Sequence, residues 1–114
     1  MLRSGDVVEI DLGVPRGREA GVPHPAIVVT AQRILDAAPS VVHVVPLTST
    51  RRPFHSEIHI AADADNGLDR DSSAQCQHLR AVSVERVGEI RGRVSAMELL
   101  QVREVIAVQL DLPH

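Results

Sequence analysis

The chain has 114 residues, of which 44% are hydrophobic and 24% are charged. This length allows one domain with a modest core, and this balance excludes a disordered chain. No apolar run approaches the roughly 20 residues of a membrane-spanning helix, and the opening residues MLRSGDVVEI lack the apolar stretch of a secretion signal. We therefore expect a single domain over residues 1–114, located in the cytoplasm and without a membrane partner.

The net charge of −3 argues against broad binding to nucleic acid. All 12 basic residues are arginines, however, and four of them fall in two predicted loops: Arg16, Arg18, Arg51 and Arg52. A guanidinium suits phosphate better than an ammonium does, although loop arginines can equally be plain solvated charge. Phe54 is the only aromatic residue, so stacking on single-stranded bases would fall to arginines and histidines.

Cys76 is the only cysteine, which excludes an internal disulfide and a cysteine-rich zinc site. It falls in a predicted strand, where a buried structural thiol is expected and a nucleophile is the alternative. A loop over residues 63–71 is acidic, but it resembles no calcium-binding loop closely enough to predict a metal.

The first half of the chain is predicted to be strands. Val8, Ile10 and Leu12 alternate with acidic residues, which indicates a strand with one buried face. Residues 13–23 are rich in Gly and Pro and form a predicted loop. Continuous apolar runs over 25–30 and 41–48 predict strands covered on both faces, with a short helix over 32–38 between them.

The second half continues with shorter elements. Residues 56–60 alternate as a strand does, 63–71 form a turn region, and 88–94 are the predicted last strand. Residues 72–79 and 81–84 resemble strands with weaker patterning. Polar residues that we expect to point outward from one strand here could read RNA bases: Gln75, Gln77, His78 and Arg80.

The C-terminal segment is predicted to be a helix. Ser95 and Glu98 have the spacing of a capping box, in which each side chain satisfies a backbone amide of the other. Two apolar stripes follow: Leu99, Val102, Ile106 and Leu110, and then Met97, Val105, Val108 and Leu112. The second stripe indicates either contact with another subunit or a helix sunk deeper into its own core. Many short strands with one terminal helix predict an α+β fold, a partly closed antiparallel β-barrel.

The order of these motifs resembles that of the MazF/PemK toxins. The N-terminal signature appears as GDVVEIDL (5–12), PRGRE (15–19) and PAIVVT (25–30), the next strand as VVPLTS (44–49), and the later Asp-Ser…Arg pattern within 70–95. The resemblance implies an SH3-like barrel, a homodimer and an antitoxin partner whose disordered tail occludes the RNA groove. It also implies cleavage of single-stranded RNA, messenger RNA or else transfer or ribosomal RNA, at short sequences. The products would carry 2′,3′-cyclic phosphate and 5′-hydroxyl ends, and neither metal nor cofactor is required.

The resemblance assigns catalytic roles to three positions, one of which departs from the family pattern. The usual Arg-Pro pair reads His24-Pro25 here, the catalytic threonine matches Thr48, and a loop glutamate matches Glu19. His24 is interpreted as a general acid or base, the alternative being a loop histidine that ends a turn. Thr48 is interpreted as a phosphate ligand, the alternative being a strand-end hydroxyl satisfied by the backbone. The predicted RNA-binding residues are Arg16, Arg18, Ser49, Arg51, Arg52, Gln77 and His78.

Two other functions fit the same fold. A toxin of the CcdB type would poison DNA gyrase by binding it, without a nuclease site, and the barrel alone does not exclude this. A catalytically inactive relative would only bind RNA or an antitoxin. The threonine favours the nuclease, and the missing arginine slightly favours the gyrase poison.

Overall fold

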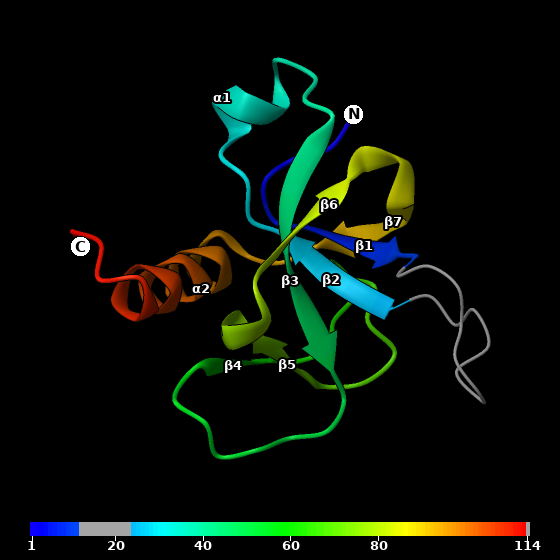
Figure 1. Ribbon diagram of the computed structural model, residues 1–114. Coiled ribbons are helices and arrows are strands. Elements are labelled where there is room, and N and C mark those ends of the chain that lie inside the picture. Colours follow the sequence, from blue (N-terminus) through cyan, green and yellow to red (C-terminus); the bar gives the residue numbers. More distant parts are fainter. Residues whose placement is uncertain (12–23, 114) are drawn as a thin grey trace, which may run out of the picture.

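The computed structural model describes residues 1–11 and 24–113 (Figure 1). Leu12 and the predicted loop 13–23, with Arg16, Arg18 and Glu19, lie outside the described residues. Within those two ranges, seven strands form one sheet in the order β4-β5-β3-β2-β1-β7, and β6 pairs with β3 beside this path. The strands are β1 (Asp6–Ile10), β2 (His24–Val28), β3 (Val41–Thr48), β4 (Glu57–Ile60), β5 (Ser72–Gln75), β6 (Arg80–Ser83) and β7 (Val87–Arg93).

All of these strand pairs are antiparallel. β4 and β7 end the path, and no pairing between described strands joins them, so the sheet stays open. The predicted partly closed antiparallel barrel with a C-terminal helix is therefore confirmed.

β3 has the predicted bounds and pairs with three strands. It pairs with β6 over Val41–Val44, with β2 over 44–46 and with β5 over 47–48. Its side chains enter two separate core clusters: Val42 and Val44 lie in one, and Val45 and Leu47 in the other. Burial on both faces explains why the run is apolar without interruption.

The prediction of a single strand over 72–79 is wrong. β5 ends at Gln75, Cys76–His78 form the 3₁₀ helix η1, and β6 begins at Arg80. The turn is needed because β5 pairs with the end of β3 and β6 with its beginning, so the chain must travel back along β3. The four polar residues therefore do not alternate on one strand: Gln75, Gln77, His78 and Arg80.

The other boundaries differ little from those predicted. α1 spans Gln32–Leu35 and stops short of residue 38, where Ala38 adopts a φ of 52° that no helix continues. A second 3₁₀ helix, η2 (Val84–Arg86), follows β6 and leads into β7.

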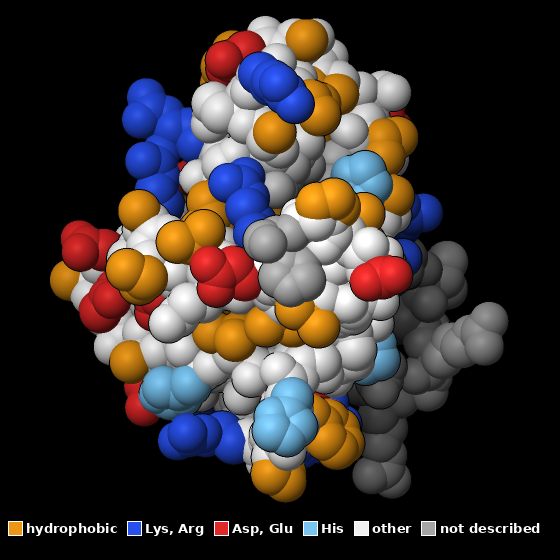
Figure 2. Space-filling model, turned by 90° about the vertical axis from the view of Figure 1, so that its left-hand side faces the viewer, with side chains coloured by type: hydrophobic (Ala, Val, Ile, Leu, Met, Phe, Trp, Pro, Cys, Tyr) orange, Lys and Arg blue, Asp and Glu red, His pale blue; other side chains and the backbone are white. Residues whose placement is uncertain are grey.

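The C-terminal helix α2 spans Ala96–Gln109 and begins with the predicted capping box. The Glu98 amide donates to Ser95 Oγ at 3.0 Å, and the Ser95 amide donates to Glu98 Oε1 at 2.9 Å. Val102 is fully buried against the core, whereas Met97 is 63% and Val108 62% exposed. The alternative of a helix sunk into its own core is therefore wrong. Figure 2 shows hydrophobic side chains on the surface of the side of the molecule where α2 lies in Figure 1.

Arg103 fastens α2 to the sheet. Its guanidinium donates to the carbonyl of Val29 at 3.1 Å and to Ser4 Oγ at 3.2 Å, next to the end of β2. Within the described ranges, no helix has the length and apolar content needed to cross a membrane.

Candidate active site

A solvent-open hollow of about 360 Å³ gathers several of the predicted site residues. His24 at the start of β2, Thr48 at the end of β3 and Ser49 directly after it all line this hollow. Its other lining residues are Pro25, Leu47, Leu68, Asp69, Arg70, Ser72 and Arg91.

Strand register explains why His24 and Thr48 meet. Ala26 pairs with Pro46 in the antiparallel β2–β3 ladder, so extending that register by two residues places His24 opposite Thr48. His24 is exposed, whereas Thr48 is half-buried. Two residues that are 24 positions apart in sequence thus share one wall of the hollow.

Thr48 has one backbone partner and keeps a free donor function. Its Oγ1 accepts a hydrogen bond from the Thr50 amide at 3.2 Å. A hydroxyl that accepts one bond can still donate its own hydrogen. The Thr48 hydroxyl therefore has the backbone partner of the alternative interpretation, and it remains able to donate to a phosphate oxygen, as the predicted role requires.

The opposite wall comes from a tightly bonded turn over residues 61–70. Asn66 is fully buried, and its Oδ1 accepts from the amides of Asp63 (3.1 Å) and Leu68 (3.0 Å). Its Nδ2 donates to the carbonyl of Ala61 at 2.8 Å. These bonds hold Asp69 and Arg70 at the edge of the hollow, so part of the predicted acidic loop is an ordered structural element.

Two glycines bring this turn directly against β7. A Cβ on Gly92 would lie 2.2 Å from the carbonyl oxygen of Asp65, and one on Gly67 would lie 2.3 Å from that of Arg91. Gly67 also has a φ of +67°, which side-chain-bearing residues rarely adopt. The Arg93 amide donates to Asp65 at 2.8 Å across the same contact. Backbone therefore meets backbone, which only glycine permits here.

Arg51 and Arg52 lie outside the hollow, in the connection between β3 and β4. The Arg52 Nη2 donates to Glu57 Oε2 at 2.7 Å, and its guanidinium lies over the Phe54 ring, 5.0 Å from the ring centre. Its charge is therefore already compensated within the protein.

The Glu57 carboxylate is the centre of a polar cluster on the outer face of β4. Burial raises the pKa of Glu57, but hydrogen bonds from Gln77, Arg52 and Gln75 lower it by more, so this pKa lies below its ordinary value. Gln77 donates to Glu57 at 2.6 Å and accepts from Ser56 Oγ at 2.9 Å. Gln77 is thus held by the protein, and neither it nor His78 lines the hollow.

Cys76 is fully buried, as expected of a structural thiol, although it lies in η1 and not in a strand. Burial raises the pKa of its thiol to about 11, so a reactive thiolate is disfavoured. In the described part of the chain, no group of three or more His, Cys, Asp or Glu side chains could hold a metal ion.

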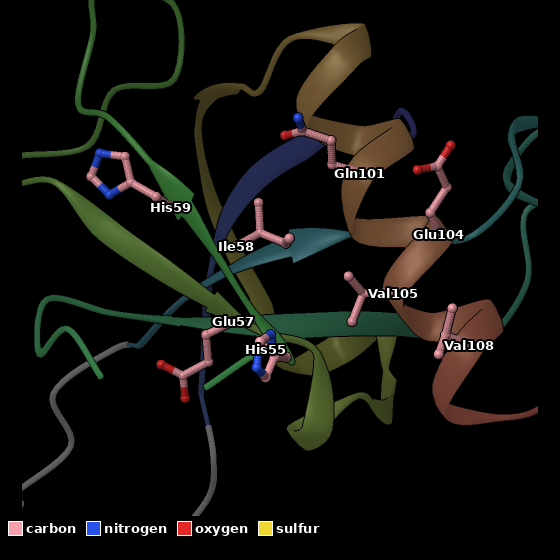
Figure 3. A pocket seen from close by; sticks show the side chains of 8 residues that line it. All are labelled: His55, Glu57, Ile58, His59, Gln101, Glu104, Val105 and Val108. Atoms are coloured by element: carbon pink, nitrogen blue, oxygen red, sulfur yellow. The ribbon is translucent and has the colours of Figure 1, made fainter. Parts of the chain in front are cut away.

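A larger hollow of about 780 Å³ lies between β4 and α2. Figure 3 shows Ile58 and Val105 facing each other across it, while the side chains of Glu57 and His59 point away from the helix. Its floor is apolar, and its lining includes histidines and carboxylates but no arginine, serine or threonine to hold a phosphate. We therefore place the candidate site in the smaller, more polar hollow.

Sequence reasoning missed Arg70, Ser72 and Arg91 as members of the site. They come from the turn, from the start of β5 and from β7, and each lies more than 20 residues from Thr48 in the sequence. Only the predicted acidic loop over 63–71, which includes Arg70, gave any local signal. No periodicity marks Arg91, because its position depends on how β7 pairs with β1.

The fold is that of solved MazF toxins. The structure of the toxin MazF-mt6 from Mycobacterium tuberculosis matches with a TM-score of 0.74 and 22% identity, over 95% of this chain and 99% of that one. An endoribonuclease from a mycobacterial species, solved in complex with its cognate antitoxin, matches with a TM-score of 0.79 and 20% identity, over 100% and 99%.

Sequence similarity establishes the family itself. The model of the PemK-like, MazF-like toxins of type II toxin-antitoxin systems matches residues 3–110. The endoribonuclease MazF9 of Mycobacterium tuberculosis is 35% identical over 116 residues, which cover 98% of each chain. The chain belongs to this toxin family, and the predicted resemblance is confirmed.

Proposed function

We propose that this toxin is an endoribonuclease that cuts single-stranded RNA in the hollow between β2 and β3. The observation that carries the proposal is the meeting of His24 with the Thr48 hydroxyl in one solvent-open hollow that arginines also line. The endoribonuclease activity of the 35% identical relative supports it. The family match favours the nuclease over a gyrase poison.

The cleavage uses the RNA's own 2′-hydroxyl as nucleophile, so no metal is required. The 2′-oxygen bonds to phosphorus, the bond to the 5′-oxygen breaks, and the 2′-hydroxyl loses a proton while the leaving oxygen gains one. A histidine can perform either proton transfer near neutral pH, and His24 is exposed at the hollow. Thr48 and Ser49 donate to the phosphate oxygens, where charge develops.

The test is cleavage of long single-stranded RNA in the presence of EDTA, with the new ends mapped. We expect discrete cuts that leave 5′-hydroxyl and 2′,3′-cyclic phosphate ends. His24→Ala should lower the cleavage rate roughly 100-fold while RNA binding is retained. His43→Ala is the matched control, because His43 is exposed on β3 and does not line the hollow.

A pH profile assigns the role of His24. A rate that rises with pH and loses this rise in His24→Ala indicates a base, and one that falls indicates an acid. An unchanged rate in His24→Ala would remove it from the mechanism. No cleavage by the wild-type protein would indicate the inactive relative, and gyrase inhibition in addition would indicate the poison.

The remaining assignments are proposals from the resemblance. Glu19 would contribute to the site, and Arg16 and Arg18 would bind RNA, with Arg51 exposed on the β3–β4 connection as a further contact. A cognate antitoxin would cover the hollow with its disordered tail, and the protein would act in the cytoplasm as one toxin domain over residues 1–114.

A homodimer is also proposed. Met97, Leu100 and Val108 are at least half-exposed and lie on one side of α2, and exposed apolar surface of this kind marks interaction sites. Light scattering should give the mass of a dimer, and Met97→Glu combined with Val108→Glu should give a monomer. A wild-type monomer would exclude this assembly.

A further inference from the structure

We propose that Arg91 and Asp69 form the phosphate subsite of the hollow. Arg91 binds a backbone phosphate of the RNA, and in the free protein Asp69 forms an ion pair with Arg91 that the phosphate replaces. This inference rests on the proposed RNA-cleaving function. It identifies Arg91 as the positive charge that compensates for the family arginine, whose position is His24 in this chain.

The first observation is a β-bulge that includes Arg91. Val7 pairs with Gly92 and Val8 pairs with Ile90, so Arg91 is the extra residue of β7 opposite β1. A bulge leaves its extra residue unpaired and redirects its side chain, and bulges are common beside active sites. Here the redirected side chain lines the hollow with His24 and Thr48.

The second observation is the partner of Arg91. Its Nη2 lies 3.0 Å from Asp69 Oδ2, and the Arg91 side chain is 21% exposed while that of Asp69 is 86% exposed. Asp69 is the polar partner of the Arg91 guanidinium among the described residues. Arg91 is therefore held in place by packing, with donor groups still available, whereas Asp69 is a solvated carboxylate that can swing away.

The third observation is how the backbone that carries both residues is fixed in position. The Asn66-bonded turn carries Asp69, and the close contacts at Gly67 and Gly92 press that turn against β7 beside Arg91. A preorganised guanidinium loses little freedom when it binds an anion, and its planar fork fits two phosphate oxygens. Arg70 lines the same hollow and adds a second positive charge.

The different exposures of the two side chains allow an RNA phosphate to replace the Asp69 carboxylate on Arg91. An ion pair with a highly exposed partner is weak and screened by water. An RNA phosphate in the hollow can displace Asp69 from Arg91, and the developing negative charge of the pentavalent phosphorus would strengthen that contact. Asp69 then acts as an internal competitor that neutralises Arg91 in the free protein.

The experiment measures RNA binding and cleavage separately. A single-stranded RNA that contains a mapped cut site is made with a 2′-deoxy nucleotide at the attacking position, so that it binds without being cut. Fluorescence anisotropy gives its affinity at several salt concentrations. The variants are Arg91→Gln and Asp69→Asn, and Arg33→Gln in α1 removes the same charge from a residue outside the hollow.

We expect Arg91→Gln to weaken binding roughly tenfold and to lower the salt dependence by about 0.7 in log affinity per log salt, the value for one phosphate contact on a single strand. Asp69→Asn should tighten binding, by roughly two- to fivefold, because it removes the competitor. Arg33→Gln should change neither quantity appreciably. Arg91→Lys keeps the charge without the fork and should recover part of the affinity.

Unchanged affinity in a folded Arg91→Gln, or unchanged or weaker affinity in Asp69→Asn, would overturn the subsite. Should Arg91→Gln fail to fold, Asp69→Asn decides alone, since Asp69 is exposed and its replacement disturbs little packing. Wild-type protein that does not cut the unmodified RNA would contradict the proposed function, whereas wild-type cutting with these negative results would contradict only the subsite.

Discussion

The contact between Gly92 and the 61–70 turn gives the sharpest prediction. In Gly92→Ala, the added Cβ would lie 2.2 Å from the Asp65 carbonyl oxygen, so the turn must retreat by about 1.2 Å to restore an ordinary contact of 3.4 Å. Overpacking of this kind costs about 1–3 kcal/mol, and stretching the bond from the Arg93 amide to Asp65 adds about 1 kcal/mol.

The expected result is a lower melting temperature. Each kcal/mol corresponds to roughly 4 °C for a chain of this size, so Gly92→Ala should lower the melting temperature by roughly 8–16 °C in a thermal scan followed by circular dichroism. RNA cleavage, measured well below the transition, should also fall, because the retreating turn carries the positive charge of Arg70 away from the hollow.

Gly88→Ala is the matched control, because it lies in the same strand and its Cβ would be 3.4 Å from the nearest atom, the Glu9 carbonyl oxygen. We expect it to shift the melting temperature by only a few degrees. Equal melting temperatures for the two variants would refute the idea that backbone contact at Gly92 fixes the turn.

Three further predictions concern single groups. Glu57→Gln should lower the free energy of unfolding by about 1–3 kcal/mol, because it replaces the charged acceptor of three hydrogen bonds with a neutral amide. Urea titration measures this, and a loss below 0.5 kcal/mol would contradict it. The depressed pKa of Glu57 implies stability that is fully present above the unfolded-state pKa and is lost as pH falls through the folded-state pKa, so the wild-type advantage over Glu57→Gln should shrink in acid. Cys76 should resist a thiol reagent in the folded protein and react fully in denaturant, since its pKa is about 11 and it is buried; rapid native labelling would show that η1 opens. Ser95→Ala should cost about 1 kcal/mol through loss of the capping box, whereas Ser95→Asp should retain most of the stability.

The strands that fill the core were predictable because buried strands have a continuous or alternating pattern of apolar residues in the sequence. β3 was predicted to the residue, and the capping box placed the start of α2. Local patterns failed where the chain changes its partner. Residues 76–78 look extended in sequence, but the chain must move from one end of β3 to the other at that point.

The candidate site was half predictable for a similar reason. His24 and Thr48 follow from the resemblance, and their juxtaposition follows from strand register. Arg91 depends on a bulge, and a bulge shifts register without leaving a mark in hydrophobic periodicity. The guanidinium of Arg52 could bind a phosphate, but it already forms an ion pair with Glu57.

The pairing of β1 with β7 joins Asp6 to Arg93, which lie 87 positions apart in the sequence. Such a contact is costly to form early, because a long stretch of chain must be closed before it yields any stabilisation. The hollow lined by His24, Thr48 and Arg91 is therefore completed only once β7 has paired with β1, late in folding.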